Sequence, residues 1–85
     1  MFYYVYILKS LKNDSLYIGY TSDLKNRIKN HNSCKIKSTK NLKPWRLVYY
    51  EAFVSKNAAR KDELFLKTGK GRERLKFLLK SGEVA

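Results

Sequence analysis

Apolar and polar positions divide the first part of the chain into a hairpin followed by a helix. Residues 2–8 are rich in aromatic and β-branched side chains and are apolar on both faces, so they predict a central strand buried on both sides. A polar turn cluster at 12–15 leads into a second such run at 16–20, and together the runs predict an antiparallel hairpin. Gly19, near the end of the second run, permits a bend or a close backbone approach.

The next segment predicts an amphipathic helix over residues 22–31. Thr21 or Ser22 is suitable as its N-cap, and Asp23 adds a negative charge to the first turn. Four residues with the spacing i, i+3, i+4, i+7 share one stripe of this helix: Leu24, Arg27, Ile28 and His31. A buried charge needs a partner, so Arg27 on this core-facing stripe either belongs to a site or extends along the surface to water.

The second half of the chain begins with a long loop and a third strand. Residues 32–44 are polar and basic, and loops of this length are usually functional or mobile. Residues 45–54 are apolar and rich in strand-forming side chains, so they predict the third strand. A sheet of only three strands needs helices to cover it.

Two helices complete the predicted order. Ser55 or Asn57 can cap the first of them, which ends before Gly69. Gly69 and Gly71 break the helical pattern, and the last helix is predicted over residues 72–80. The order strand, strand, helix, strand, helix, helix predicts a small α+β fold, with a three-stranded antiparallel sheet flanked by helices.

The charge balance predicts a binding partner for this fold. The chain is short enough to form one domain, 1–85, and it carries 19 Lys and Arg against 7 Asp and Glu, a formal net charge of +12. An excess of this size repels itself, so a polyanionic partner is expected. Nucleic acid is the first candidate and an anionic membrane surface the second, although no basic anchor helix with an aromatic face is evident. The alternative is a solvated basic surface without a partner.

Cysteine content and hydropathy argue against a disulfide-bonded, zinc-binding, membrane-spanning or secreted protein. Cys34 is the only cysteine, so no intramolecular disulfide and no Cys-based zinc site can form, and we interpret it as an incidental loop thiol. A reducing, cytoplasmic location is expected. No apolar run approaches the roughly 20 residues that span a bilayer, and the first run is too short and too polar for a signal peptide. Neither a P-loop nor a dinucleotide motif occurs, so no organic cofactor is expected.

The residues left for chemistry are one histidine, a helix-borne arginine, several tyrosines and Glu63. This set suits phosphodiester cleavage, because Arg27 can give a phosphate a bidentate donor. Mg²⁺ needs as little as one protein carboxylate, which Glu63 could supply. A hydroxyl or an imidazole must help to activate a water. The structural alternatives are core tyrosines, an ion pair of Arg27 with Glu63, and His31 as a cap of its helix.

Several motifs follow one another in a fixed order. The first three are Tyr4-Val5-Tyr6, Tyr17-Ile18-Gly19 and Thr21-x-Asp23-Leu24-x-x-Arg27-x-x-x-His31. Further on, the sequence from Asp62 to Gly69 resembles an Arg-Glu-x-x-Leu-Lys-Thr-Gly segment. On these motifs the chain resembles small standalone members of the GIY-YIG nuclease superfamily and is similar to the N-terminal nuclease domain of excinucleases. Tyr4 replaces the first motif glycine, and Tyr20 stands where excinuclease-type relatives often carry lysine.

The resemblance implies roles for individual residues. The family cuts DNA phosphodiesters with one divalent metal, here Mg²⁺ or Mn²⁺, and Glu63 corresponds to the metal ligand. Tyr6 and Tyr17 correspond to the motif tyrosines, Arg27 to the motif arginine and His31 to the motif histidine. Tyr6 is the preferred general base and Tyr17 the preferred orienter of phosphate or water, although the sequence leaves the two roles interchangeable. A free tyrosine has a pKa near ~10, so a base at neutral pH needs nearby cations.

Basic residues of the loop and of the last helices are the candidates for contacts with DNA phosphates: Lys35, Lys37, Lys40, Lys67, Lys70, Arg72 and Arg74. The sequence is thus interpreted as a Mg²⁺-dependent DNA endonuclease acting in repair or recombination. One alternative is a non-catalytic nucleic-acid binding module that keeps the scaffold, and another is a small interaction protein. Glu63 favours the enzyme, because a carboxylate opposes a polyanion unless a metal intervenes.

Overall fold

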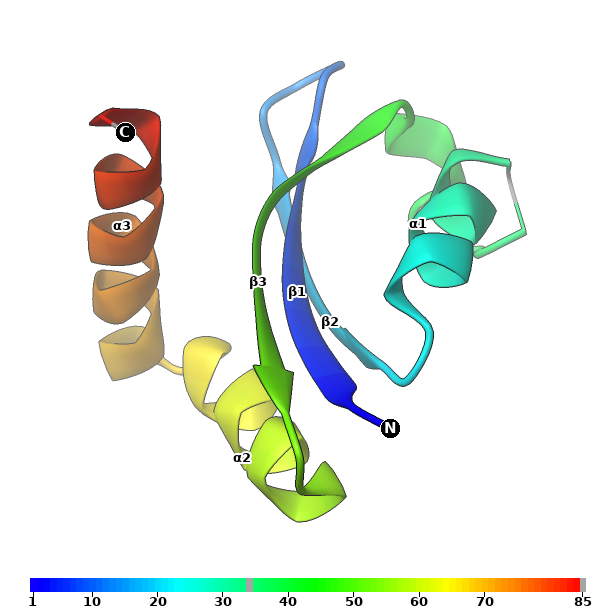
Figure 1. Ribbon diagram of the computed structural model, residues 1–85. Coiled ribbons are helices and arrows are strands. Elements are labelled where there is room, and N and C mark those ends of the chain that lie inside the picture. The colour runs from blue at the N-terminus through cyan, green and yellow to red at the C-terminus, as the bar shows by residue number, and fades with distance from the viewer. Residues whose placement is uncertain (34, 85) are drawn as a thin grey trace.

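The protein folds into one three-stranded sheet with helices on both faces (Figure 1). The structure is a computed structural model and describes residues 1–33 and 35–84, so Cys34 lies outside the described residues. The elements are β1 (Tyr3–Ser10), β2 (Leu16–Thr21), α1 (Leu24–Asn32), the short 3-10 helix η1 (Lys40–Leu42), β3 (Trp45–Phe53), α2 (Lys56–Leu66) and α3 (Gly69–Val84). The predicted α+β class is confirmed.

The central strand is β1, as the apolar pattern predicts. The sheet has the order β2-β1-β3, and β1 pairs antiparallel with both neighbours. Side chains alternate between the faces of a strand, so Val5 and Ile7 enter one half of the core while Tyr6 and Leu8 enter the other. All four are fully buried. The first strand is therefore apolar on both faces because each face carries a helical layer.

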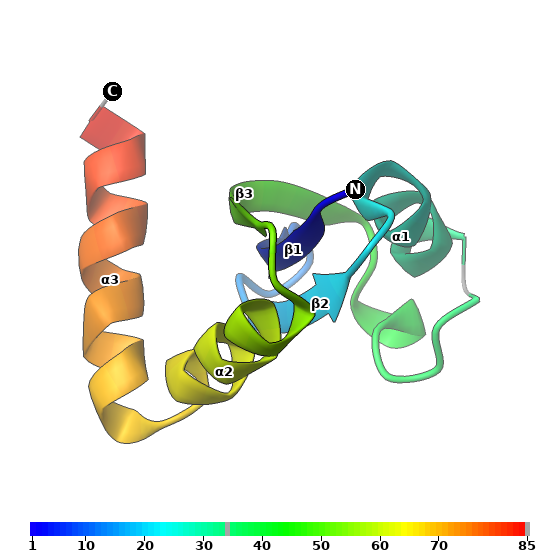
Figure 2. The same cartoon turned by 60° about the horizontal axis from the view of Figure 1, so that its bottom comes forward.

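Each face of the sheet is covered by different helices. Residues of α2 and α3 pack against the Val5 face: Ala59, Leu66 and Leu75. Residues of α1 and of η1 pack against the Tyr6 face: Leu24, Ile28 and Leu42. Figures 1 and 2 show α1 and α3 on opposite sides of the sheet, with α2 running past the strand ends that lie near the N-terminus. The helical layers thus divide the sequence motifs, with Arg27 and His31 on one layer and Glu63 on the other.

Helix α1 carries the predicted stripe but begins later than predicted. Its N-cap is Asp23, whose side chain accepts a hydrogen bond from the Asn26 amide at 3.2 Å. Thr21, predicted as a cap, instead accepts a hydrogen bond from the Asp23 amide at 3.1 Å and so forms the turn that precedes the helix. The stripe faces the sheet, and His31 is its fully buried member.

The predicted start of α3 is wrong. The helix begins at Gly69 rather than near Arg72, and the break from α2 falls at residues 67–68. Thr68 begins the new helix, because its hydroxyl accepts from the Gly71 amide at 3.1 Å and its carbonyl from the Arg72 amide at 2.9 Å. A Cβ at Gly71 would collide with the backbone of Phe65 and Leu66. Gly71 therefore permits the tight corner between the helices rather than ending one. Ser55 caps α2, as predicted.

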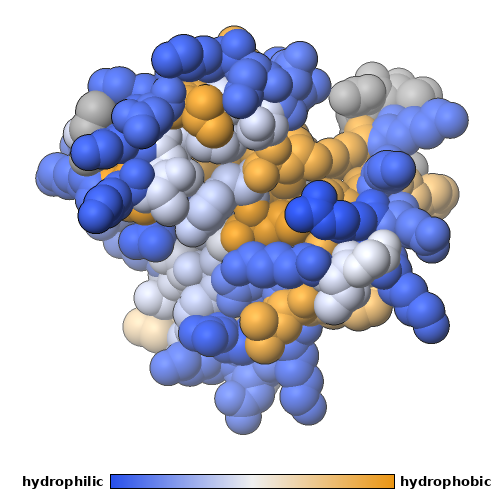
Figure 3. Space-filling view, turned by 180° about the vertical axis from the view of Figure 1, so that it is seen from behind, coloured by the Kyte–Doolittle hydropathy of each residue, from blue (hydrophilic) through white to orange (hydrophobic). Residues whose placement is uncertain are grey.

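A hollow opens between α3 and the sheet, and apolar side chains gather there on the face seen in Figure 3. Its apolar lining comes from the hairpin, β3 and α3: Leu11, Leu16, Leu47, Val48 and Leu79. None of the predicted site residues lines it. Within the described residues, no helix has the length and apolar character needed to cross a membrane.

Candidate functional site

The candidate site centres on the Tyr6 hydroxyl. Tyr6 is fully buried on the central strand, and its Oη lies 2.8 Å from Nε2 of His31. Arg27 donates from Nε to the same oxygen at 3.4 Å. Strand β1 and helix α1 therefore bring three predicted site residues into one hydrogen-bonded cluster.

Burial and charge act in opposite directions on Tyr6. Burial raises the pKa of the Tyr6 hydroxyl above its usual value near ~10, and the hydrogen bond from Arg27 acts against that rise. The hydrogen bond with Tyr6 also raises the pKa of Arg27, which stays charged. Of the two opposing influences on Tyr6, burial is the stronger, so the phenol is protonated at neutral pH in the protein alone.

Arg27 is half-buried and contacts the site without forming an ion pair with Glu63. Its guanidinium reaches Tyr6 through Nε, which leaves the other four N–H groups of the fork outside that bond. The structural alternative of an ion pair between Arg27 and Glu63 is therefore absent from the described residues. An arginine that is half-buried and bonded to Tyr6 through Nε can still offer other donors to a phosphate.

His31 is fixed from both sides. Its Nδ1 lies 2.8 Å from Oγ1 of Thr39, and its Nε2 faces Tyr6. Burial lowers the pKa of His31 from 6.5 to about 4, and the Arg27 charge contributes in the same direction. His31 is fully buried and bonds two side chains, so it does not cap the C-terminus of α1. At neutral pH the ring is uncharged.

The loop after α1 is held against the start of β3. Asn32 donates to the Trp45 carbonyl at 3.0 Å and accepts from the Trp45 amide at 2.6 Å. The Trp45 indole donates to the Thr39 carbonyl at 2.8 Å. These bonds hold Thr39 in the position where it contacts Nδ1 of His31. Sequence reasoning missed Thr39, Trp45 and Asn32, because the loop gave only a charge signal and no periodicity.

Gly19 makes room for the Tyr6 ring. It pairs with Tyr6 across the hairpin, and a Cβ at this position would collide with Cζ and Oη of Tyr6. The motif glycine is therefore required by a close approach of a side chain to the backbone of β2. Without that approach the Tyr6 hydroxyl could not extend across β2 toward Arg27.

Tyr17 lies beside this cluster. Its ring centroid is 4.9 Å from that of His31 and 6.4 Å from that of Tyr6. Tyr17 is half-buried, whereas Tyr6 is fully buried. The two motif tyrosines therefore differ in access to solvent.

Glu63 approaches the cluster from the other helical layer. Its side chain is 13% exposed and pairs with Nε of Arg60 at 3.6 Å and with Nζ of Lys67 at 3.2 Å. The Glu63 charge is among the influences that raise the pKa of Tyr6, so the carboxylate lies within electrostatic range of that hydroxyl. Its hydrogen-bond partner among the described residues is Lys67, rather than Tyr6 or Arg27. The structure thus joins four of the five predicted residues by direct contact, whereas Glu63, on the other helical layer, contacts Arg60 and Lys67.

Glu63, as a single carboxylate, fits a hard divalent cation that needs only one protein ligand. No group of three or more His, Cys, Asp or Glu side chains comes together in the part of the chain that the structure describes. A single carboxylate suits Mg²⁺, which keeps most of its waters and takes further oxygens from a substrate phosphate. It does not suit Zn²⁺, which usually needs three or four protein ligands.

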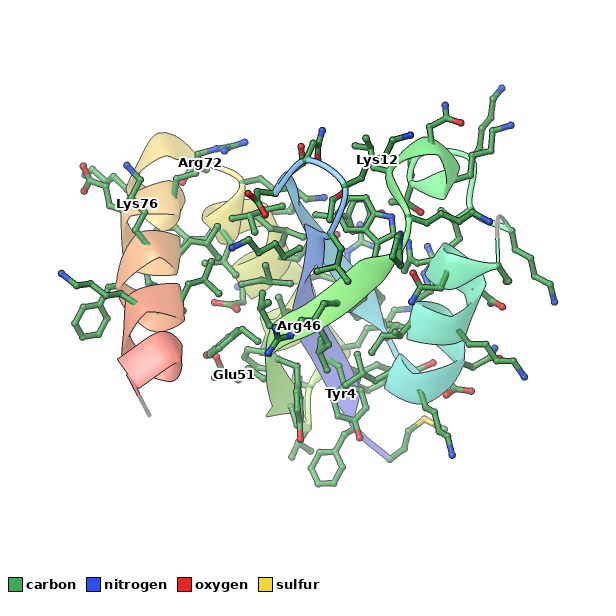
Figure 4. All side chains as sticks on the ribbon, turned by 90° about the horizontal axis from the view of Figure 1, so that it is seen from above. Tyr4, Lys12, Arg46, Glu51, Arg72 and Lys76 are labelled. Carbon is green, nitrogen blue, oxygen red and sulfur yellow. The ribbon has the colours of Figure 1, made fainter. Side chains whose placement is uncertain are left out.

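The predicted DNA-contacting residues form two groups on opposite sides of the molecule. Lys35, Lys37 and Lys40 are exposed on the loop that carries Thr39, next to His31. Lys67, Lys70 and Arg72 are exposed around the α2–α3 corner, and Figure 4 shows Arg72 and Lys76 on the far side of the sheet from α1. Arg74 is also exposed on α3, and its charge lowers the pKa of Asp62 against the larger effect of burial.

Comparisons with known proteins show the family of the chain. Residues 2–76 match the GIY-YIG catalytic domain. A UPF0213 protein of Clostridium perfringens is 48% identical over 65 residues, covering 75% of this chain and 69% of that protein. A UPF0213 protein of Staphylococcus haemolyticus is 44% identical over 77 residues, covering 89% and 93%.

A solved structure supports the same assignment. The solution NMR structure of the UPF0213 protein BH0048 from Bacillus halodurans is 43% identical, with a TM-score of 0.56, and the match covers 92% of this chain and 85% of that one. The sequence and the fold are thus those of a single family. This chain belongs to the GIY-YIG catalytic domain family.

Proposed function

We propose that this protein is a divalent-metal-dependent endonuclease that hydrolyses DNA phosphodiester bonds, in repair or recombination, and therefore acts in the cytoplasm. The observation that carries the proposal is the Tyr6–His31–Arg27 cluster, with the Glu63 charge acting on the same hydroxyl. A buried phenol, an uncharged histidine and a charged arginine meet at one oxygen atom there, and such clusters of perturbed groups are typical of functional sites. Family membership supports nuclease chemistry, and the net charge of +12 supports a nucleic-acid substrate.

Each residue has a role that its surroundings support. Arg27 binds the scissile phosphate and stabilises the charge that develops on it, using donors not bonded to Tyr6. Tyr6 is fully buried, so the attacking water reaches its oxygen only when substrate binding opens the site, and His31 then accepts the Tyr6 hydrogen. Tyr17, the more accessible tyrosine, orients the phosphate or the water. The raised pKa of Tyr6 means that its proton must leave only as that of the water arrives.

Glu63 is the residue that would hold the metal, Mg²⁺ or Mn²⁺. When bound, such an ion supplies positive charge for the phosphate oxygens and makes a coordinated water more acidic. Glu63 would have to exchange its contacts with Arg60 and Lys67 for that ligand, which an ion pair of modest strength allows. The two basic groups would hold the DNA backbone on either side of the site, one beside His31 and one beside Glu63.

A non-catalytic nucleic-acid binding module is the second candidate. It is favoured by the two cations that already neutralise Glu63 and by the raised pKa of Tyr6, since both oppose catalysis. A cleavage screen separates the two functions. Labelled duplex, single-stranded, flap and branched DNA are incubated with the protein with and without Mg²⁺ or Mn²⁺, and binding is measured in parallel. Metal-dependent cleavage of any substrate supports the enzyme, and binding without cleavage supports the module.

A further inference from the structure

Thr39 contacts Nδ1 of His31, the ring nitrogen that does not face Tyr6, and so completes the arrangement of protons around Tyr6. Its hydroxyl oxygen lies 2.8 Å from Nδ1 of His31 and 3.4 Å from the Ile36 carbonyl oxygen. Thr39 is 1% exposed, and its own carbonyl is bonded to the Trp45 indole. The residue therefore has no freedom to turn toward water.

The proton positions follow from counting donors and acceptors. Arg27 can only donate, so the Tyr6 oxygen accepts from it and the Tyr6 hydrogen must find another acceptor. Among the described residues, the other hydrogen-bond partner of this hydroxyl is Nε2 of His31. If Nε2 carried a hydrogen, the hydrogen of a fully buried phenol would have no acceptor. Nε2 is therefore unprotonated.

The second ring nitrogen then has a definite state. A neutral imidazole without hydrogen on Nε2 carries it on Nδ1, which donates to Oγ1 of Thr39. The single Thr39 hydrogen is directed to the Ile36 carbonyl. In this arrangement each hydrogen along the series of hydrogen bonds from Arg27 through Tyr6 and His31 to Thr39 has an acceptor. With the hydrogen on Nε2 instead, the Tyr6 hydrogen has none.

We propose that Thr39 is a positioning residue that fixes His31 as the Nδ1–H tautomer, so that Nε2 accepts the Tyr6 hydrogen and Tyr6 offers only lone pairs to the reaction. The role of this His31 tautomer in DNA cleavage rests on the proposed function. Tyr6 then serves as an acceptor toward water and cannot donate to the leaving oxygen. In that step the Tyr6 oxygen takes a proton from the attacking water while its own passes to Nε2, so that one proton moves in total from water to His31.

The test uses the fact that His31 is the only histidine in the chain. Long-range ¹H–¹⁵N NMR of the uniformly ¹⁵N-labelled protein near pH 7.5 reports the protonation of its two ring nitrogens without assignment ambiguity. We expect a protonated Nδ1 and an unprotonated Nε2 in the wild type. A wild-type spectrum with the hydrogen on Nε2 overturns the proposal, and this outcome needs no variant to fold and no DNA to be cleaved.

Variants at residue 39 show whether Thr39 sets the tautomer. Thr39→Val keeps the shape but removes the acceptor, so the Nε2–H form should appear and cleavage should fall about tenfold or more, with melting checked by circular dichroism. Thr39→Ser should restore both readouts, and Ser38→Ala removes an exposed hydroxyl next to it and should change neither. An unchanged ring pattern in folded Thr39→Val overturns the positioning role. If the tautomer behaves as expected but the wild type cleaves no DNA, the proposed function fails while the positioning role stands.

Discussion

The Tyr6 hydroxyl lies 2.8 Å from Nε2 of His31, although 25 positions separate the two residues in the sequence. One residue belongs to the central strand and the other to the last turn of α1, and both are fully buried. The hydrogen bond therefore depends on how α1 packs against the sheet. Changes that move the Tyr6 ring or the helix should disturb the site before they unfold the protein.

Gly19→Ala tests whether the Tyr6 ring needs the space that a residue without a side chain leaves at position 19. The added methyl group would collide with the end of the Tyr6 ring, which must then move away from His31 and Arg27. We expect a loss of about 1–3 kcal/mol in the free energy of unfolding, typical of overpacking, together with a loss of cleavage. Chemical denaturation and cleavage assays measure the two effects.

Gly69→Ala is the matched control for that substitution. A Cβ at Gly69 has no neighbour within 4 Å, so the change should leave stability and cleavage near wild type. Equal effects of the two alanines would show that the Tyr6 contact does not explain why Gly19 is needed.

Arg27→Lys separates charge from hydrogen-bond geometry. Lysine keeps the positive charge but has neither Nε nor a planar fork, so it cannot bind Tyr6 and a phosphate together. We expect cleavage to fall by a factor of about 10² or more, while DNA affinity changes little. Arg27→Ala should weaken both. Arg46 is an exposed arginine on β3, so Arg46→Ala is the control and should leave the cleavage rate unchanged. Wild-type cleavage by Arg27→Lys would argue against a specific phosphate contact.

His31 should make the protein acid-sensitive. The unfolded chain binds a proton at His31 as the pH falls through 6.5, whereas the folded protein does so only near pH 4. Protons therefore favour the unfolded state across this window, and the stability present above pH 6.5 is lost as the pH falls toward 4. The full effect is about 3.5 kcal/mol, at ~1.4 kcal/mol per pH unit between 6.5 and about 4.

Denaturation curves of the wild type and His31→Gln between pH 4 and 7.5 measure this effect. Glutamine does not titrate, so the pH dependence assigned to His31 should vanish in the variant. The raised pKa of Asp62 affects both proteins equally and cancels in the difference. Parallel curves for the two proteins would mean that His31 accepts its proton at an ordinary pH.

The two basic groups predict the salt dependence of DNA binding. Each neutralised phosphate contributes about −0.9 to the slope of log affinity against log salt on duplex DNA, so removing two contacts should reduce the slope by about 1.8. We expect this for Lys35→Gln with Lys37→Gln, and for Lys70→Gln with Arg72→Gln. The control pair is Lys9→Gln with Arg46→Gln, cross-strand neighbours outside both groups. Equal slopes for all three double variants would indicate diffuse attraction instead of two contact groups.

Local patterns account for most of what the sequence can predict. Strand β1 is recognisable because its apolar residues occupy both faces, and the α1 stripe because the spacing of Leu24, Arg27, Ile28 and His31 matches the helical period. Neither pattern depends on distant parts of the chain. The motif resemblance adds Glu63, which periodicity alone would leave as an ordinary helix residue.

The features that the sequence does not reveal depend on contacts between distant segments. Thr39 binds His31 because Asn32 and Trp45 anchor the intervening loop, and no local spacing encodes that. The start of α3 is misplaced by the sequence pattern because glycine normally weakens a helix, which makes Gly71 look like a break. Its lack of a side chain instead lets α3 pass close to the backbone of Phe65 and Leu66.

Glu63→Gln tests whether this site cleaves DNA with the help of a metal held by Glu63. The change removes the charge but keeps the shape. Glu73→Gln, an exposed acid on α3 outside the site, is the matched control. Cleavage of the best substrate from the screen is measured with Mg²⁺ and with EDTA, alongside DNA binding and melting curves. We expect Mg²⁺-dependent cleavage by the wild type and Glu73→Gln, and a folded, inactive Glu63→Gln that binds DNA at least as tightly. Wild-type cleavage by folded Glu63→Gln, or cleavage that persists in EDTA, would rule out the metal role of Glu63.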